Sequence, residues 1–304
     1  MILLTGANGF LGSSILGRIL KRPEQIVAVD LQEEIIRVNA PDGCLYLNGS
    51  INDLEFISRL KNEFHFTSVI HCAALIAKNE GKEDVQRLMA VNVDGTANIT
   101  EIAAAHGARI IFPSTAMVYG DNGTPFAETM QKNPSNSYAV SKHLAEEIIM
   151  ESSKIYGFDY AIARIAVLYG PGQGGDMFIP AAVKSLADGK SFPMTSGEQE
   201  RDFIHVEDLL DLFEIFLSCA EVRGVFNAGT GNPETLAKAA LLIREACGTE
   251  AMPVFGAIPY RPNELWKYSV DPFLAKARFG WFPSVKFSDG IKGVVEHYKK
   301  GIEQ

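Results

Sequence analysis

Residues 1–30 read MILLTGANGFLGSSILGRILKRPEQIVAVD, and this stretch decides the fold. The apolar run at 1–5 predicts a buried strand, and the glycine-rich run after it predicts a tight turn. Residues 13–20 have the apolar spacing of a helix, and residues 26–30 predict a second strand that ends on the carboxylate of Asp30. Strand, glycine turn, helix, strand and terminal acid form the arrangement that a dinucleotide-binding site requires.

Glycine is expected at each of the three positions of the turn for a different reason. Gly6 lets the backbone turn sharply out of the strand, and Gly12 allows the helix to pack closely on that strand. Gly9 leaves room for a pyrophosphate at the helix N-terminus, where unpaired N–H groups and the helix dipole favour negative charge. We therefore expect cofactor contacts from the glycines and from Phe10 and Leu11. An ordinary glycine-rich turn in another α/β protein is the alternative.

Asp30 indicates which dinucleotide is bound. A carboxylate at this strand end accepts hydrogen bonds from the adenosine ribose hydroxyls and repels a 2′-phosphate, so the sequence favours NAD over NADP.

Composition excludes several classes of protein. The 304-residue chain has a formal net charge of -9 and no basic run, which argues against a nucleic-acid partner. We find no apolar segment long enough to span a bilayer, and the opening strand leaves no room for a signal peptide. Cys44, Cys72, Cys219 and Cys247 are too scattered for a disulfide framework or a zinc site, and no metal site is expected. We therefore expect a cytoplasmic protein.

Apolar strands and helical segments alternate as far as Arg164. Further strands are expected at 44–47, 68–72, 108–113 and 160–164, and helices at 53–60, 83–105 and 136–156. This alternation predicts an α/β fold with a Rossmann-type doubly wound parallel sheet, which binds ligands at the carboxyl ends of its strands. We expect a cofactor domain at 1–168, to which the chain returns around 203–228. Residues 169–304 are expected to form mainly a smaller α/β substrate lobe.

Tyr138 and Lys142 are the candidate catalytic pair. They lie four residues apart on an expected helix and so share one face. A nearby lysine cation, together with a positively charged nicotinamide, would stabilise the phenolate and lower the tyrosine pKa, which is about 10 in a free side chain. Thr115, at the end of the preceding strand, would hold the reacting oxygen. Tyr119 is a competing tyrosine, but no lysine follows it at the same spacing.

These motifs together resemble the extended branch of the short-chain dehydrogenase/reductase superfamily, and in particular its nucleotide-sugar epimerases and dehydratases. The resemblance extends over nearly the whole chain and includes the Gly-x-x-Gly-x-x-Gly turn, the Arg-Asp-Phe segment at 201–203 and the Arg-Pro turn at 261–262. Ser50 stands where the family usually has Asp. The resemblance implies further cofactor contacts from Ser50, Ile51, Ala73, Ala74 and Asn92. A homodimer formed through the helices at 83–105 and 136–156 is common in the family, but the apolar faces of these helices are equally compatible with core packing.

The second half of the chain indicates the substrate class. A nucleotide sugar carries a diphosphate, which guanidinium groups bind through paired hydrogen bonds, so Arg201 and Arg261 are its expected ligands. The alternative for both is a surface ion pair. Lys78 resembles a substrate contact of the family, and it is equally compatible with a solvated loop lysine.

Departures from the family pattern narrow the reaction. Ala116 and Met117 replace the Asp-Glu pair of the 4,6-dehydratases and cannot transfer protons, which disfavours dehydration. Val167 stands where many UDP-sugar 4-epimerases have Asn, and residues 258–264 resemble those of some 4-ketoreductases. We expect an NAD-dependent nucleotide-sugar epimerase that acts at carbon 4 through a keto intermediate. The alternatives are an NAD(P)H-dependent nucleotide-4-keto-6-deoxysugar reductase and a non-catalytic nucleotide-binding regulator.

Overall fold

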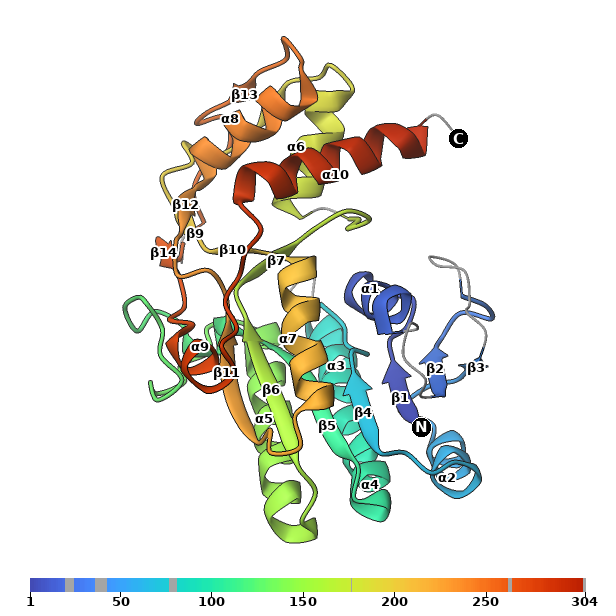
Figure 1. Cartoon of the computed structure of the whole chain (residues 1–304). Coiled ribbons are helices and arrows are strands. Elements are labelled where there is room, and N and C mark those ends of the chain that lie inside the picture. The colour runs from blue at the N-terminus through green and yellow to red at the C-terminus, as the bar shows by residue number, and fades with distance from the viewer. Residues whose placement is uncertain (20–24, 36–42, 77–80, 176, 262–263, 303–304) are drawn as a thin grey trace. The chain divides into compact units, whose positions relative to one another are not determined.

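The computed structural model describes residues 1–19, 25–35, 43–76, 81–175, 177–261 and 264–302 (Figure 1). The chain divides into two compact units. Unit 1 comprises residues 1–120, 130–164 and 210–226, and unit 2 comprises residues 121–129, 165–209 and 227–304. Unit 1 carries the glycine turn and the Tyr138–Lys142 pair, whereas unit 2 carries Arg201 and Arg261.

Unit 1 is built on a seven-stranded sheet in the order β11-β6-β5-β4-β1-β2-β3. Its strands are β1 (Ile2–Thr5), β2 (Ile26–Asp30), β3 (Cys44–Asn48), β4 (Ser68–His71), β5 (Arg109–Thr115), β6 (Tyr160–Ile165) and β11 (Gly224–Ala228). β1 pairs in parallel with both β2 and β4, so the direction in which the chain adds strands reverses between β1 and β4. The predicted doubly wound α/β fold is confirmed.

Helices cover both faces of this sheet (Figure 1). The helical segments of unit 1 are α1 (Phe10–Ile19), α2 (Leu54–Glu63), α3 (Lys82–Met89), η1 (Ala90–Asp94), α4 (Gly95–His106), η2 (Ala116–Tyr119), α5 (Ser137–Tyr156) and α7 (Val206–Ser218). Arg18 of α1 forms ion pairs with Asp211 and Glu214 of α7, which joins these two helices. α2, α4 and α5 pack side by side on the opposite face.

The helix expected at 83–105 is present, because helical residues run without a gap from Lys82 to His106. Its α-helical hydrogen bonding is interrupted by the π-helical turn η1 between α3 and α4. Because a π turn contains one more residue than an α turn, it changes the direction in which the following side chains point. The interruption contains Asn92, which is buried and hydrogen-bonded to two other segments.

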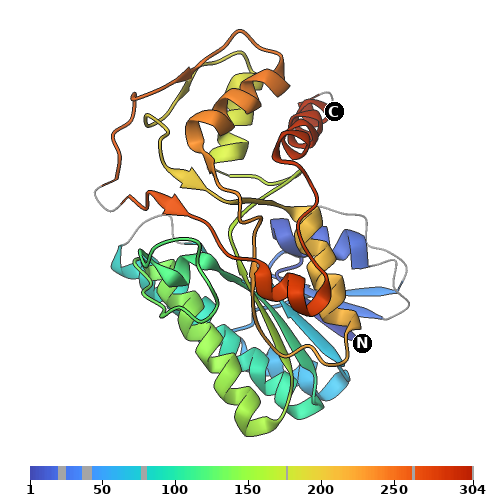
Figure 2. The ribbon, with the colours of Figure 1, turned by 60° about the vertical axis from the view of Figure 1, so that its left-hand side comes forward.

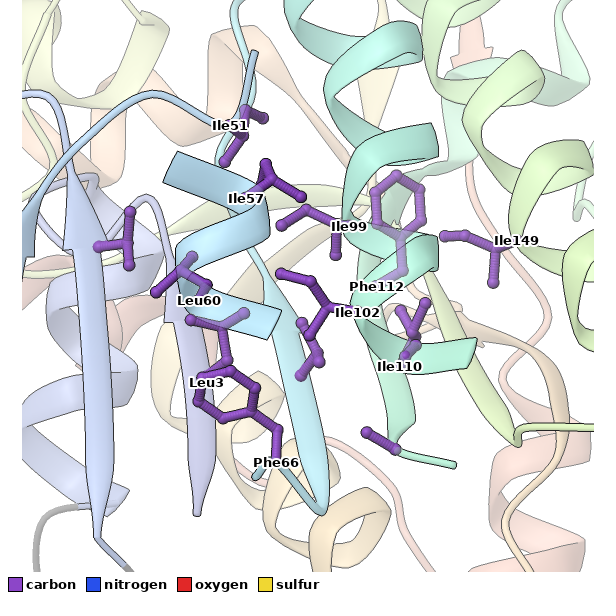
Figure 3. Packing of buried hydrophobic residues seen from close by; sticks show 14 of the residues in the cluster. Leu3, Ile51, Ile57, Leu60, Phe66, Ile99, Ile102, Ile110, Phe112 and Ile149 are labelled. Carbon is purple, nitrogen blue, oxygen red and sulfur yellow. The ribbon is translucent and has the colours of Figure 1, made fainter. Parts of the chain in front are cut away.

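A hydrophobic core of unit 1 lies between the sheet and the α2–α4–α5 layer (Figure 3). Leu3 and Phe112 project from the sheet, and Ile99, Ile102 and Ile149 face them from the helices. All five side chains are buried. Strands covered on both faces are continuously apolar, which explains the uninterrupted apolar runs that made them recognisable in the sequence.

Unit 2 combines short strand pairs with a helical layer. Its strands are β7 (Val167–Tyr169), β8 (Phe192–Pro193), β9 (Glu200–Arg201), β10 (Phe203–His205), β12 (Glu234–Thr235), β13 (Pro253–Val254) and β14 (Lys267–Tyr268), and its further helices are α6 (Phe178–Ala187), α8 (Leu236–Cys247), α9 (Phe273–Phe279) and α10 (Phe287–Ile302). α6, α8 and α10 pack against one another (Figure 2). Within the described ranges, no helix has both the length and the apolar character needed to cross a membrane.

A buried carboxylate organises the strand ends of unit 2. Asp202 has no exposed surface, and its oxygens accept hydrogen bonds from the backbone N–H groups of Thr230, Gly231 and Val270 at 2.8, 3.0 and 3.3 Å. In the Arg-Asp-Phe segment, the middle residue Asp202 therefore has a structural role. Its carboxylate fixes the loop after β11 to the loop after β14.

Candidate active site

The site in unit 1 begins where the strand order reverses. Thr5 Oγ1, at the end of β1, lies 2.7 Å from Nδ1 of His71, at the end of β4. The Cys72 N–H donates to the Thr5 carbonyl at 3.1 Å. The glycine turn leaves β1 directly after these contacts. It therefore lies at the crevice where open α/β sheets bind their ligands.

Gly6 and Gly12 are required by the packing of the chain on itself. Gly6 has a φ of +70°, and a Cβ there would lie 2.6 Å from the Ala73 nitrogen. A Cβ on Gly12 would lie 2.0 Å from the Gly6 oxygen, well inside van der Waals contact. A Cβ on Gly9 would approach the same oxygen only to 3.2 Å, and Gly9 is exposed. The space above Gly9 is therefore open to a ligand.

The start of α1 presents free donors to that space. The Ser13 N–H makes an intrahelical hydrogen bond to the Gly9 carbonyl at 2.9 Å. The N–H groups of Phe10, Leu11 and Gly12 precede it in the first turn, where helix geometry provides no partner within the helix. Such a helix N-terminus binds phosphate groups through its N–H groups and its dipole.

Asp30 anchors the glycine turn. Its carboxylate accepts the Asn8 N–H at 2.8 Å and the Leu31 N–H at 2.7 Å. The Gly49 N–H donates to the Asp30 carbonyl at 2.9 Å, which brings the turn that contains Ser50 and Ile51 to the end of β2. Since an ionised carboxylate has about four acceptor positions, Asp30 can still accept hydrogen bonds from ribose hydroxyls.

The buried side chain of Asn92 joins the segment after β4 to the catalytic helix. Its Nδ2 donates to the Leu75 carbonyl and to Ser141 Oγ, both at 2.9 Å, and its Oδ1 accepts the Leu75 N–H at 2.7 Å. Ser141 Oγ donates in turn to the Tyr138 carbonyl at 2.8 Å. Asn92 therefore fixes the chain just after Ala73 and Ala74 against the first turn of α5.

Thr115, Tyr138 and Lys142 lie on the two elements expected for them. Thr115 is the last residue of β5, and Tyr138 lies in the first turn of α5, where Asn136 caps the helix by accepting the Ala139 N–H at 2.8 Å. Lys142 follows one turn later and is only 2 % exposed. Its ammonium lies 3.8 Å from the centre of the Phe112 ring, an arrangement that stabilises a desolvated cation.

Burial changes the proton chemistry of this pair. Desolvation raises the pKa of Tyr138 to about 12. Desolvation also lowers the pKa of Lys142 to about 7, although electrostatic interactions with Cys72 and Glu146 act in the opposite direction. The expected fall in the tyrosine pKa is therefore not found in the protein alone, because both charged forms lose hydration when buried.

Tyr119, the competing tyrosine, is engaged elsewhere. Its ring is fully buried, and its hydroxyl accepts a hydrogen bond from Arg164 Nη1 at 3.0 Å. Arg164 also forms a buried ion pair with Glu146 on α5. Sequence reasoning missed Glu146 and Arg164. The available signal for Glu146 was its position four residues after Lys142, on the same helix face.

The site in unit 2 is centred on Arg201 in β9. Arg201 Nη2 donates to a Glu264 carboxylate oxygen at 2.6 Å, and Nη1 donates to the Leu265 carbonyl at 2.7 Å. The Glu264 N–H donates to the Arg261 carbonyl at 3.2 Å, so the Arg-Pro turn begins beside the residue that pairs with Arg201. The Arg261 side chain is exposed. Lys78 lies outside the described residues.

A cavity of about 120 Å³ adjoins Arg201. The residues that line it are mostly apolar and come from β7, the segment before α6, α6 itself, β9, β10 and α8: Val167, Leu168, Gln173, Met177, Phe178, Ile179, Arg201, Phe203 and Leu236. Val167 therefore lies in the wall of this cavity. Its apolar side chain cannot make the hydrogen bonds of an Asn.

Comparison with known proteins identifies the relatives of this arrangement. A model of the NAD-dependent epimerase/dehydratase family matches residues 2–229. A putative UDP-glucose 4-epimerase from Methanocaldococcus jannaschii is 29% identical over 310 residues, which cover 98% of each chain. Among solved structures, the UDP-glucose 4-epimerase of Thermotoga maritima with UDP-glucose has a TM-score of 0.91 at 27% identity, covering 99% of both chains. The Thermus thermophilus UDP-glucose 4-epimerase complex with NAD has a TM-score of 0.88 at 27% identity, covering 98% of both chains.

Proposed function

The chain belongs to the NAD-dependent epimerase/dehydratase family, and from that premise we propose that it inverts carbon 4 of a nucleotide-linked sugar through a keto intermediate. One observation carries the proposal. Tyr138 and the buried Lys142 share a face of α5, while the hydrogen bonds of Asn92 and Ser141 attach that helix to the crevice beside the glycine turn.

NAD fits the residues at this crevice. The first-turn N–H groups of α1 and the open space above Gly9 suit its pyrophosphate. The remaining acceptor capacity of Asp30 suits its adenosine ribose. When bound, NAD supplies reversible hydride exchange with the sugar carbon.

The residues of α5 and β5 would move and hold the proton. Tyr138 would remove the proton of the sugar 4-hydroxyl and return it after the ketone has turned its other face. Thr115 Oγ1 would donate a hydrogen bond to the same sugar oxygen. Because the Tyr138 pKa is about 12 in the protein alone, its phenolate depends on nearby positive charge, which Lys142 supplies when protonated.

Unit 2 would hold the diphosphate of the substrate. Arg201 is held in position by Glu264 and by the Leu265 carbonyl, and Arg261 begins the same turn. A guanidinium restrained by a carboxylate is already ordered before an anion binds, which lowers the entropic cost of binding. The apolar wall at Val167 supports a substrate pose without the Asn contact of many relatives. The cytoplasmic location and the homodimer stay predictions.

The test of the proposed function is incubation with UDP-, dTDP-, CDP- and GDP-hexoses and with their 4-keto-6-deoxy derivatives. We expect inversion at carbon 4 without added cofactor, because a bound NAD that is restored in each cycle needs no replacement. Conversion of a keto-sugar only, with stoichiometric loss of NADH or NADPH, would contradict epimerisation and favour the ketoreductase. Binding without conversion of any sugar would favour the regulator.

Asp30→Asn is expected to change the preference for the cofactor. The variant keeps the size of the side chain but loses the negative charge and part of the acceptor capacity that faces the ribose. We expect NAD binding to weaken by about tenfold and the ratio of NADP to NAD affinity to rise by a similar factor. Titration calorimetry with both cofactors measures the change. An unaltered ratio would show that Asp30 does not select against the 2′-phosphate.

A further inference from the structure

A buried ion pair lies one helical turn beyond Lys142. The side chain of Glu146 has no exposed surface, and that of Arg164 is 2 % exposed. Arg164 Nη2 donates to Glu146 Oε2 at 2.8 Å, and Nε lies 3.2 Å from each carboxylate oxygen. Residues four apart lie on the same face of a helix, so the carboxylate lies on the Lys142 side of α5.

The Glu146 carboxylate is held from several elements at once. Ser114 Oγ on β5 donates to Oε1, and the Arg164 guanidinium on β6 also donates to the Tyr119 hydroxyl on η2 at 3.0 Å. Burying a charged carboxylate is costly unless it is paired and hydrogen-bonded. These donors therefore hold the Glu146 carboxylate in place within the buried ion pair.

The groups that act on Lys142 differ in charge. From the end of β4, His71 and Cys72 approach it, and burial lowers the pKa of His71 to about 3 and raises that of Cys72 to about 12. Both are therefore neutral near pH 7, as is Tyr138 with a pKa raised by burial to about 12. Two groups raise the pKa of Lys142 against the effect of desolvation, Cys72 and then Glu146, and of these two Glu146 is the one held in a buried ion pair.

Other charged groups on the elements packed against α5 are bound to other partners or exposed. His106 of α4 is bound to the Lys61 carbonyl, and Arg109 of β5 to the carbonyls of Phe216 and Cys219. The charged side chains that are exposed on α3, η1 and α4 are Lys82, Glu83, Asp84, Arg87, Asp94 and Glu101. Solvent screens their effect on Lys142.

We propose that Glu146 is a positioning residue that keeps Lys142 charged beside Tyr138, while Ser114 and Arg164 hold the Glu146 carboxylate in place. The catalytic use of Lys142 rests on the proposed function, but the charge relation between the two side chains does not. The face of α5 thus carries Tyr138, Lys142 and Glu146 in successive turns, and Glu146 links the proton-transfer pair to β5 and β6.

The test follows the titration of Lys142 itself by NMR of the full chain with ¹³C-labelled lysine side chains, with Lys142→Arg used to assign the signal. Glu146→Gln removes a negative charge at nearly constant size, so the ammonium is less stabilised. We expect the midpoint to move about one unit toward lower pH. Turnover should also depend on the protonation of Tyr138 and Lys142. The apparent pKa values of this pair in the pH profile of turnover should likewise move toward lower pH, because loss of a negative charge favours proton loss from both groups.

A second variant separates charge from folding. Glu146→Gln removes the buried carboxylate with which Arg164 forms an ion pair, which destabilises the fold, whereas Glu146→Gln with Arg164→Met removes both charges and is expected to recover thermal stability. In the double variant we expect the midpoint to stay about half a unit below that of the unmodified protein, because Glu146 acts on Lys142 from the next turn of the same helix face, whereas Arg164 acts from β6. Glu147→Gln is the matched control. It removes the same charge from the next residue, whose carboxylate pairs with Lys132 at 2.7 Å, and should leave the midpoint in place.

Two results would overturn the proposal. One is a double variant that recovers stability together with the original midpoint, because Glu146 would then act only through folding. The other is an equal shift in Glu147→Gln, because any acid on α5 would then suffice. Because the titration needs no substrate, the Lys142 midpoint can be measured and interpreted even if the proposed function is wrong. Retained turnover in Tyr138→Phe would contradict that function without changing the Lys142 midpoint.

Discussion

Tyr138→Phe is expected to lower turnover of the nucleotide sugar by about 10³-fold while changing NAD affinity by no more than about twofold. The substitution removes one hydroxyl and keeps the ring. General acid–base groups contribute about 10²–10⁴-fold to enzyme rates, and the expected loss lies in the middle of that range. The same hydroxyl serves both halves of the epimerase cycle. Turnover is measured by the conversion of sugar, and NAD affinity by calorimetry.

The matched control for this experiment is Tyr156→Phe. Tyr156 is the last residue of the same helix and is exposed, so loss of its hydroxyl should leave turnover and NAD binding unchanged. Turnover of Tyr138→Phe within tenfold of the unmodified protein would contradict the assignment of Tyr138. A parallel loss of NAD binding would instead indicate that Tyr138 is needed to form the cofactor site.

The bounds of helices and strands were predicted best where the local sequence pattern agrees with the burial of the segment. Residues 26–30 form a strand with the predicted bounds, because a continuous apolar run ending on an acid suits a strand covered on both faces. The helix expected at 83–105 is present, but the π-helical turn within it could not be predicted from periodicity. This turn accompanies hydrogen bonds between Asn92 and Leu75, 17 residues away, and between Asn92 and Ser141, 49 residues away.

In the candidate site, too, the features set by local sequence were predictable and those set by tertiary packing were not. The spacing of Tyr138 and Lys142 on one helix face was visible in the sequence. Their protonation was not, because the Lys142 pKa depends on the residues that remove water from its ammonium. Phe112 comes from β5 and Cys72 from the end of β4, so both reach Lys142 only through the packing of the sheet against α5.

Gly12→Ala and Gly9→Ala are expected to affect stability and NAD binding differently. In Gly12→Ala, the new methyl group would lie 2.0 Å from a backbone oxygen, and no side-chain rotation relieves this contact. Alanine is favoured over glycine by about 1 kcal/mol inside a helix, but overpacking costs about 1–3 kcal/mol and, at this separation, the upper end or more. We expect a net loss of about 2 kcal/mol in the free energy of unfolding, together with weaker NAD binding, because α1 must move away from β1.

In Gly9→Ala, the methyl group meets the same oxygen only at 3.2 Å, so the free energy of unfolding should change by less than about 1 kcal/mol. The methyl group nevertheless projects into the space expected for the pyrophosphate, and NAD affinity should fall by about tenfold or more. Urea unfolding without NAD and calorimetry with NAD measure the two effects separately. If Gly9→Ala bound NAD as tightly as the unmodified protein, the first turn of α1 could not be the pyrophosphate site. A loss confined to binding would locate the ligand above Gly9, because the chain itself makes little demand for glycine there.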